Sequence, residues 1–297
     1  MLLRNENIFK YYLITVSLIF IALFVAVLCT MFYKSFPSIQ HFGIKFYTSD
    51  TWNPATHEYG ALAFLIGTLI TSFLALLISL PFSLMIGIFL GEYYREGWLS
   101  NALKSMVELL AGIPSIVYGI WGLFVFVPFI RNIMLWFIDM GLLDIPPYGI
   151  GMFTASIILA VMIIPYSASI GREVISLVPN DLKEAGYSMG ATRFELVKNI
   201  ILPYCKSGIF AGNLMALGRA LGETMAVTMV IGNRNVIPQT IFDPASTLAS
   251  VLALEFAEST NIIHLSSLVH LGLVLFITTV LINLAGKSVI NRSRKGM

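Results

Sequence analysis

The chain has 297 residues, of which 57% are hydrophobic and only 11% are charged, and its formal net charge is +2. A water-soluble fold of this size could not shield so much apolar surface, so the composition indicates an integral membrane protein. The small net charge says little about partners, because in a membrane protein the position of Lys and Arg carries the information. The two cysteines, Cys29 and Cys205, fall near opposite faces of the bilayer on the topology below, so we interpret each as a small core hydrophobe rather than half of a disulfide.

Apolar runs long enough to cross about 30 Å of bilayer divide the chain into six predicted helical spans. The first run, Tyr11 to Tyr33, is too long for the apolar region of a signal peptide, and no small-residue cleavage site follows it, so it is predicted to be retained. A further apolar segment, 247–257, has the length of a re-entrant or interfacial helix. The predicted spans cover 11–33, 60–90, 105–130, 148–170, 207–232 and 262–285, within one all-α transmembrane domain, 1–297.

The distribution of basic residues predicts the orientation of the spans. With the amino terminus inside, thirteen Lys and Arg fall in inner segments and four in outer segments, so both termini and the polar passage 179–203 are predicted to be cytoplasmic. The inner set is Arg4, Lys10, Arg95, Lys104, Arg172, Lys183, Arg193, Lys198, Lys206, Lys287, Arg292, Arg294 and Lys295, and the outer set is Lys34, Lys45, Arg131 and Arg234.

The polar passage 179–203 has the pattern of two short helices joined by a glycine. Asp181 is predicted to cap the first helix, with Glu184 three residues later, and Gly190 suits the left-handed residue that ends it. Between two membrane spans, such a unit is either a connector folded on its own protein or a docking site for another chain. A DNA-reading helix-turn-helix does not fit this context, and no nucleic-acid partner is expected.

The second predicted helix of the passage begins with a capping box, T-x-x-E, at Thr192 and Glu195, and is expected to end at Pro203. Each helix has one apolar face that needs a covering surface. These faces are Leu182, Ala185 and Met189 in the first helix, and Phe194, Val197 and Ile201 in the second.

The spacing within this passage resembles the EAA coupling loop of bacterial ABC importer permeases, E-A-A-x3-G-x9-I-x-L-P. Gly186 replaces the second alanine, and the spacing is otherwise intact. The resemblance implies that the passage docks a separate ATPase subunit. It assigns the coupling role to Glu184, Ala185, Gly186, Gly190, Leu202 and Pro203.

Arg219 is predicted to lie about 18 Å into the fifth span, near the middle of the bilayer, where a charge costs on the order of 3 kcal/mol or more. Glu223, one turn further on, is expected to neutralise it. Two interpretations remain open: a self-compensated pair that fixes helix packing, or a guanidinium that faces a cavity and binds an anion such as phosphate. Glu108, one turn after Lys104, is either paired with that lysine at the inner membrane edge or part of the pathway.

Two segments, RALGETMAV at Arg219–Val227 and AGIPSIVYG at Ala111–Gly119, resemble the PstC-type permeases of bacterial phosphate ABC importers, and the likeness extends over essentially the whole chain. It implies a type I importer (MetI-like) fold in the bacterial inner membrane and transport-relevant roles for Arg219 and Glu223. The implied partners are a related PstA-type permease, a dimer of a PstB-type ATPase that binds ATP and Mg, a PstS-type phosphate-binding protein and membrane lipid.

The chain itself is not expected to be an enzyme or to hold a cofactor or metal. Gly286-Lys287-Ser288 is not a phosphate loop, because Leu281 stands where the first glycine is required and no strand precedes it. His264 and His270 are interpreted as packing or interfacial residues. The sequence leaves open a permease for another oxyanion (sulfate or molybdate), an ATP-independent anion transporter or channel, and whether the partner permease is a second copy.

Overall fold

The computed structural model describes residues 2–142, 144–259 and 261–295, with side chains described from residue 9 to residue 291. The expected arrangement is confirmed, because six helices in the described part are long and apolar enough to cross a membrane. The side chains of Arg4, Arg292, Arg294 and Lys295, which contributed to the predicted orientation, lie outside the described residues. The six helices are Phe9–Phe42, Leu62–Tyr93, Ser115–Asp139, Met152–Ser176, Arg193–Leu221 and Ile262–Asn291.

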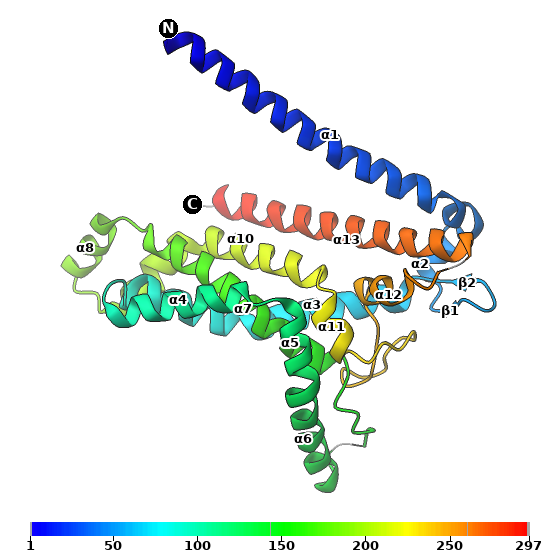
Figure 1. Cartoon of the computed structure of the whole chain (residues 1–297). Coiled ribbons are helices and arrows are strands. Elements are labelled where there is room, and N and C mark those ends of the chain that lie inside the picture. Colours follow the sequence, from blue (N-terminus) through cyan, green and yellow to red (C-terminus); the bar gives the residue numbers. More distant parts are fainter. Residues whose placement is uncertain (1, 143, 260, 296–297) are drawn as a thin grey trace.

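Two long helices, α3 (Leu62–Ile88) and α7 (Met152–Ser176), form the centre of the bundle and contact each other along their length (Figure 1). Apolar side chains of α7 are fully buried between their neighbours, so this helix lies in the core of the bundle. Around this pair, α10 (Leu202–Leu221) packs against α7 and α3, and α13 (Ile262–Lys295) packs against α10.

The first helix, α1 (Leu2–Phe42), contacts α13 near its carboxyl end and diverges from the bundle toward its amino end (Figure 1). It runs beyond the predicted boundary at residue 33. Its apolar side chains along the diverging part are exposed, so lipid or another apolar protein surface must cover them. Cys29 is exposed on this helix, contrary to the core position expected for it, whereas Cys205 is buried.

The third predicted span is not one continuous helix. Helix α4 (Trp98–Gly112) follows the direction of the bundle, and the chain then turns so that α5 (Ser115–Trp121) and α6 (Val127–Asp139) run across it (Figure 1). The prediction of a single span over 105–130 was therefore wrong. The physical cause is Pro114, which holds itself and Ile113 in extended backbone, with ψ of 138° and 130°.

The fifth predicted span, 207–232, is also interrupted. Helix α10 ends at Leu221, and a short helix, α11 (Met225–Val230), begins four residues later. At the other end, Pro203 does not stop the helix as expected. Helix α9 (Arg193–Leu196) continues through a π-helical turn, Val197–Ile201, into α10, and Pro203, which has no N–H to donate, lies just after that turn, where the hydrogen-bond pattern of the helix is already altered.

The remaining elements lie at the two ends of the bundle. At the end we call the α8 end, α3 finishes in a π-helical turn, Phe89–Tyr93, and α8 (Asn180–Ser188) follows α7. The opposite end carries α12 (Leu248–Glu255), which Thr247 caps, within the apolar segment predicted as a re-entrant or interfacial helix. The other elements are α2 (Lys45–Thr48), the antiparallel strands β1 (Trp52–Asn53) and β2 (Glu58–Tyr59), and a π-helical turn at Gly122–Phe126 between α5 and α6.

Both predicted packing histidines of α13 make contacts at the α12 end. The His270 ring is fully buried and stacks on Phe46, with 3.9 Å between ring centroids. His264 Nε2 lies 3.0 Å from Glu255 Oε2. These contacts fasten α13 to α2 and α12.

Helix α3 meets the segment before α12 at very close range. The Leu248 amide donates a hydrogen bond of 2.9 Å to Thr68 Oγ1, and a Cβ atom on Gly67 would collide with the Ser246 carbonyl oxygen. A rigid backbone group cannot move aside as a flexible side chain can. Only glycine at position 67 therefore permits this approach.

We expect Gly67→Ala to lower the free energy of unfolding by about 1–3 kcal/mol, because the new methyl group meets backbone rather than space. Gly171→Ala is the matched control, since Gly171 is also inside a helix and a Cβ there would have no neighbour within 4 Å. Thermal unfolding of the detergent-solubilised protein measures both. An equal loss of stability in the two variants would contradict the proposed contact.

Candidate functional site

The interruptions of the third and fifth spans meet in the structure. Gly119 of α5 packs on α11, where a Cβ atom on it would lie 2.7 Å from Met229 Sδ and 3.1 Å from Ala226 Cα. The Tyr118 hydroxyl donates a 2.8 Å hydrogen bond to the Leu110 carbonyl, which ties α5 to the end of α4 across the proline break. The two segments singled out in the sequence, 111–119 and 219–227, are therefore neighbours.

Arg219 is in the last turn of α10, on an exposed side of this chain. Its guanidinium carbon is 5.9 Å from the centre of the Tyr166 ring of α7, a cation–π distance. Within the described part of the chain, no carboxylate lies within 4.0 Å of the Arg219 guanidinium.

Glu223 does not neutralise Arg219 as the sequence pattern predicted. Helix α10 ends before it, so the spacing of four residues no longer places the two side chains on one helical face. The carboxylate instead accepts a 3.4 Å hydrogen bond from the amide of Ala226, in the first turn of α11. The self-compensated pair is therefore not formed, and no described residue accepts a hydrogen bond from the guanidinium.

Glu108 is paired differently from the prediction. Its carboxylate lies 3.7 Å from Arg172 Nη2 of α7, and its side chain is 63% exposed. Lys104, its predicted partner, donates a 2.6 Å hydrogen bond to the Arg95 carbonyl. A long and exposed contact such as that of Glu108 contributes little to stability. A role for Glu108 in the pathway stays a prediction.

The polar passage 179–203 folds largely as predicted. Gly190 has φ of +85°, the left-handed conformation expected at the junction, and the Thr192–Glu195 capping box is present. The predicted cap at Asp181 was wrong. Helix α8 begins one residue earlier, after Pro179, and Asp181 lies in its first turn, where a negative charge favours the helix dipole.

Gly186, which departs from the EAA pattern, has a local structural reason. A Cβ atom at this position would lie 2.6 Å from Leu196 Cδ1 and 2.7 Å from Ile200 Cδ1. Glycine thus allows α8 to pack closely on the helix that follows the turn. This packing places the exposed Glu184 and Ala185 on the outer side of the unit.

The apolar faces of the two short helices have different surroundings. Val197 and Ile201 are buried in a cluster with Ile175 of α7 and Cys205, so this part of the predicted face is covered by the chain itself. The members of the predicted faces that remain uncovered are Leu182 (39% exposed), Ala185, Met189 (80%) and Phe194 (66%), and Tyr187 of α8 is also 46% exposed. Exposed apolar side chains of this kind are typical of protein contact surfaces.

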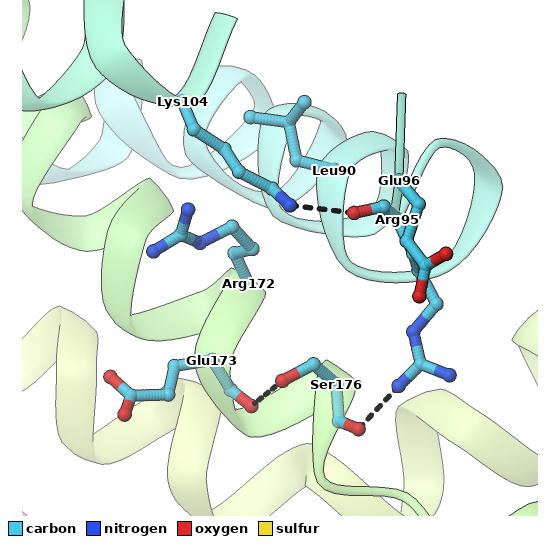
Figure 2. Close-up of a pocket in the computed structure, with 7 residues that line it drawn as sticks. All are labelled: Leu90, Arg95, Glu96, Lys104, Arg172, Glu173 and Ser176. Atoms are coloured by element: carbon cyan, nitrogen blue, oxygen red, sulfur yellow. Dashed lines mark hydrogen bonds between the residues drawn. The ribbon is translucent and has the colours of Figure 1, made fainter. Parts of the chain in front are cut away.

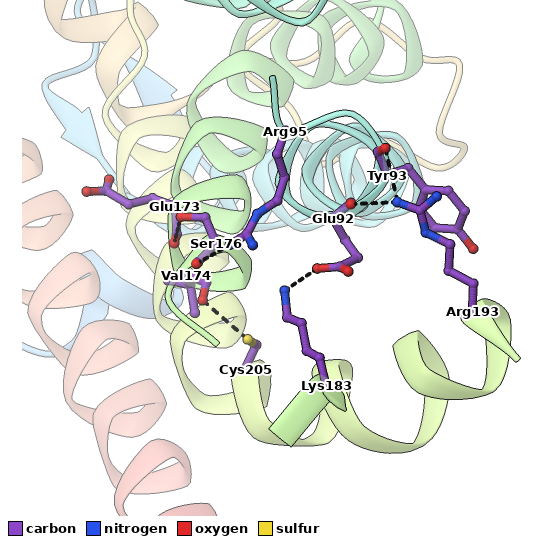
Figure 3. A network of polar contacts seen from close by, with 9 residues as sticks. All are labelled: Glu92, Tyr93, Arg95, Glu173, Val174, Ser176, Lys183, Arg193 and Cys205. Atoms are coloured by element: carbon purple, nitrogen blue, oxygen red, sulfur yellow. Dashed lines mark hydrogen bonds and ion pairs between the residues drawn. The ribbon is translucent and has the colours of Figure 1, made fainter. Parts of the chain in front are cut away.

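A set of contacts that the sequence did not predict fastens this unit to the end of α3 (Figure 3). Lys183 of α8 forms an ion pair with Glu92, and both side chains are only 8% exposed. Arg193 donates hydrogen bonds to the carbonyls of Glu92 (2.9 Å) and Tyr93 (3.1 Å), and its guanidinium lies 4.3 Å above the Tyr93 ring. We call these four residues the clamp. The partners are about a hundred residues apart in sequence, so local spacing carries no signal for them.

Most of the chain is similar to known transport proteins. Residues 83–295 match the family model described as the binding-protein-dependent transport system inner membrane component. The phosphate transport system permease protein PstC of Pasteurella multocida is 44% identical over 90% of this chain and 87% of its own length. PstC of Haemophilus influenzae is 40% identical over 98% and 94%, respectively.

Among solved structures, an inward-facing MetNI methionine ABC transporter has a similar fold, with a TM-score of 0.57. At 20% identity, over 79% of this chain and 94% of the other, the likeness concerns the fold alone. Family match, sequence identity and fold agree. The chain therefore belongs to the family of binding-protein-dependent transport system inner membrane components, and within that family it is of the PstC type.

Proposed function

We propose that this chain is the permease subunit of an ATP-driven importer of inorganic phosphate. The observation that carries the proposal is the Arg219 guanidinium, which no carboxylate of the described chain neutralises, at the meeting point of two interrupted helices. Interrupted helices near the bilayer midplane are where many transporters bind their substrates. The names of the PstC relatives support phosphate as the cargo.

Phosphate suits this guanidinium for a chemical reason. Arginine keeps its charge at any physiological pH and offers N–H donors in a planar fork that matches two phosphate oxygens. The Tyr166 ring supports the guanidinium from α7, and Glu223 bonds to the Ala226 amide rather than to Arg219. In this proposal Arg219 contacts the anion, while Glu223 fixes the α10–α11 junction that presents Arg219.

We propose that the ATPase docks on the exposed patch Leu182, Tyr187, Met189 and Phe194 and that the clamp transmits its motion. Lys183 and Arg193 hold the end of α3, α3 packs along α7, and α7 carries the Tyr166 ring beside Arg219. A rigid connection of this kind lets movement of α8 bias the bundle between two states, provided that the states differ in their contacts.

The assembly has a related PstA-type permease, a PstB-type ATPase dimer that binds ATP and Mg, and a PstS-type binding protein. The start of α1 and the end of α13 lie at the same end of the molecule as α8 (Figure 1). Together with the excess of basic residues there, this arrangement supports an inner-membrane orientation with both termini and α8 in the cytoplasm. The diverging part of α1 supplies apolar surface for lipid or the second permease.

Proteoliposomes that contain the assembled complex and binding protein test the proposed function directly. We expect ATP-dependent uptake of labelled phosphate, and at least about a tenfold loss of uptake in Arg219→Gln, because charge-assisted hydrogen bonds to the anion disappear. Arg131→Gln, which removes an exposed charge elsewhere, is the control and should transport normally.

Two outcomes would contradict this function. Phosphate uptake by the chain alone without ATP would favour an ATP-independent transporter or channel. Stronger competition by sulfate or molybdate than by unlabelled phosphate would identify another oxyanion as the cargo. Normal uptake in Arg219→Gln would instead show that Arg219 does not bind the anion and has only a structural role.

The clamp makes a separate prediction. Lys183→Met leaves the Glu92 carboxylate buried without its cation and should destabilise the subunit by about 3–5 kcal/mol. The double variant Glu92→Leu/Lys183→Met removes both charges and should recover assembly, since no unpaired buried charge remains. If the clamp transmits motion, the double variant hydrolyses ATP but moves less phosphate per ATP. Full recovery of that ratio would show that the ion pair acts only in folding.

The docking surface is tested by Glu184→Arg and Gly190→Val. The first reverses an exposed charge on α8, and the second places a β-branched residue where φ is +85°, which strains the turn. Both are expected to weaken co-purification of the ATPase and to uncouple ATP hydrolysis from uptake. Normal association and uptake in both variants would argue against docking at this unit.

A further inference from the structure

A cavity of about 570 Å³ opens at the α8 end of the bundle, between α4, α7 and the chain that joins α3 to α4 (Figure 2). Neither the Arg219 site nor the clamp uses it. Three cationic side chains, Arg95, Lys104 and Arg172, line it from different sides. Its volume is in the range of ligand-binding pockets.

Two of these cations are held in place by the chain. Arg95 donates a hydrogen bond to the Ser176 carbonyl of α7, and Lys104 donates one of 2.6 Å to the Arg95 carbonyl. Both residues are half-buried, which limits their freedom to turn into solvent. An ammonium group has three donors, so Lys104 keeps donors for a ligand.

The third cation is held only weakly. The contact between Arg172 and Glu108 is 3.7 Å long, beyond hydrogen-bond distance, and Glu108 is mostly exposed. Arg172 itself is half-buried at the cavity wall. A ligand with two oxygens in one plane would pair better with this guanidinium than Glu108 does.

The charge of the cavity favours an anion. With Glu108 beside Arg172 the formal charges sum to zero, but the lining itself has three cations, Arg95, Lys104 and Arg172, against two carboxylates, Glu96 and Glu173, a net charge of +1. Both carboxylates are exposed to solvent, and Figure 2 shows Glu173 extending away from Lys104 and Arg95. Screening by water therefore weakens the acidic contribution more than that of the half-buried cations.

We propose that this cavity binds a phosphate group, presented either by free phosphate or by the headgroup of an anionic lipid. Arg172 exchanges Glu108 for the ligand, and Lys104 and Arg95 complete the site. For free phosphate the inference rests on the proposed import function, because the α8 end then faces the cytoplasm where phosphate is released. For lipid it requires only that this end lie at the membrane surface.

The test uses the assembled complex of this chain, its partner permease and the ATPase, in nucleotide-free nanodiscs of phosphatidylcholine. Equilibrium binding of labelled inorganic phosphate is measured without binding protein. Arg172→Gln and Lys104→Gln should each weaken binding about tenfold, because each removes a charge-assisted hydrogen bond. Lys206→Gln, which removes an exposed cation outside the cavity, should leave it unchanged.

Glu108→Gln supplies an effect of opposite sign that misfolding would not produce. It removes the competitor for Arg172 and should tighten phosphate binding. In a second arm, nanodiscs contain phosphatidic acid, and native mass spectrometry counts the anionic lipid retained by the complex. Retention by wild type and Lys206→Gln, but not by Arg172→Gln or Lys104→Gln, identifies lipid as the source.

The proposal is overturned if neither phosphate binding nor lipid retention responds to Arg172 and Lys104. Phosphate binding that depends on Arg219 alone would overturn the cavity site and leave the proposed function intact. Cavity-dependent binding in a complex that shows no ATP-driven phosphate uptake would support the cavity site and contradict the proposed function. The two failures are therefore distinguishable.

Discussion

A helix interrupted inside a membrane must find new partners for the backbone groups that the break sets free, because lipid offers none. The site depends on this constraint. At the first break the Tyr118 hydroxyl bonds to the Leu110 carbonyl, and at the second the Glu223 carboxylate bonds to the Ala226 amide. Glu223 lies beyond the end of α10 and does not pair with Arg219, whose neighbour in the described chain is the Tyr166 ring.

At the clamp, in contrast to Arg219, the charged side chains are paired with each other. Lys183 and Glu92 are both buried and satisfy each other, so neither is available to a ligand. A buried pair of this kind adds little net stability compared with apolar residues, but it is costly to break from one side. It holds α8 and the end of α3 together.

Helix α7 connects these features. Tyr166 beneath Arg219 and Arg172 at the cavity are six residues apart on it, about 9 Å along the helix axis. The same helix is buried against α3, which the clamp holds. A shift of α7 relative to its neighbours would therefore change the surroundings of both Arg219 and Arg172, which physically connects the α8 end of the bundle with its centre.

The sequence by itself determined the membrane class, the number of spans, the left-handed Gly190 and the Thr192–Glu195 capping box, because hydropathy and capping depend on nearby residues. The tertiary structure decided which prolines matter: Pro81 and Pro165 lie inside intact helices, whereas Pro114 ends one. It also decided the partners of Glu223, Glu108 and Lys183. Where a helix is interrupted, and which partner a charged side chain takes, depend on the residues packed around it. Those neighbours come from distant parts of the chain.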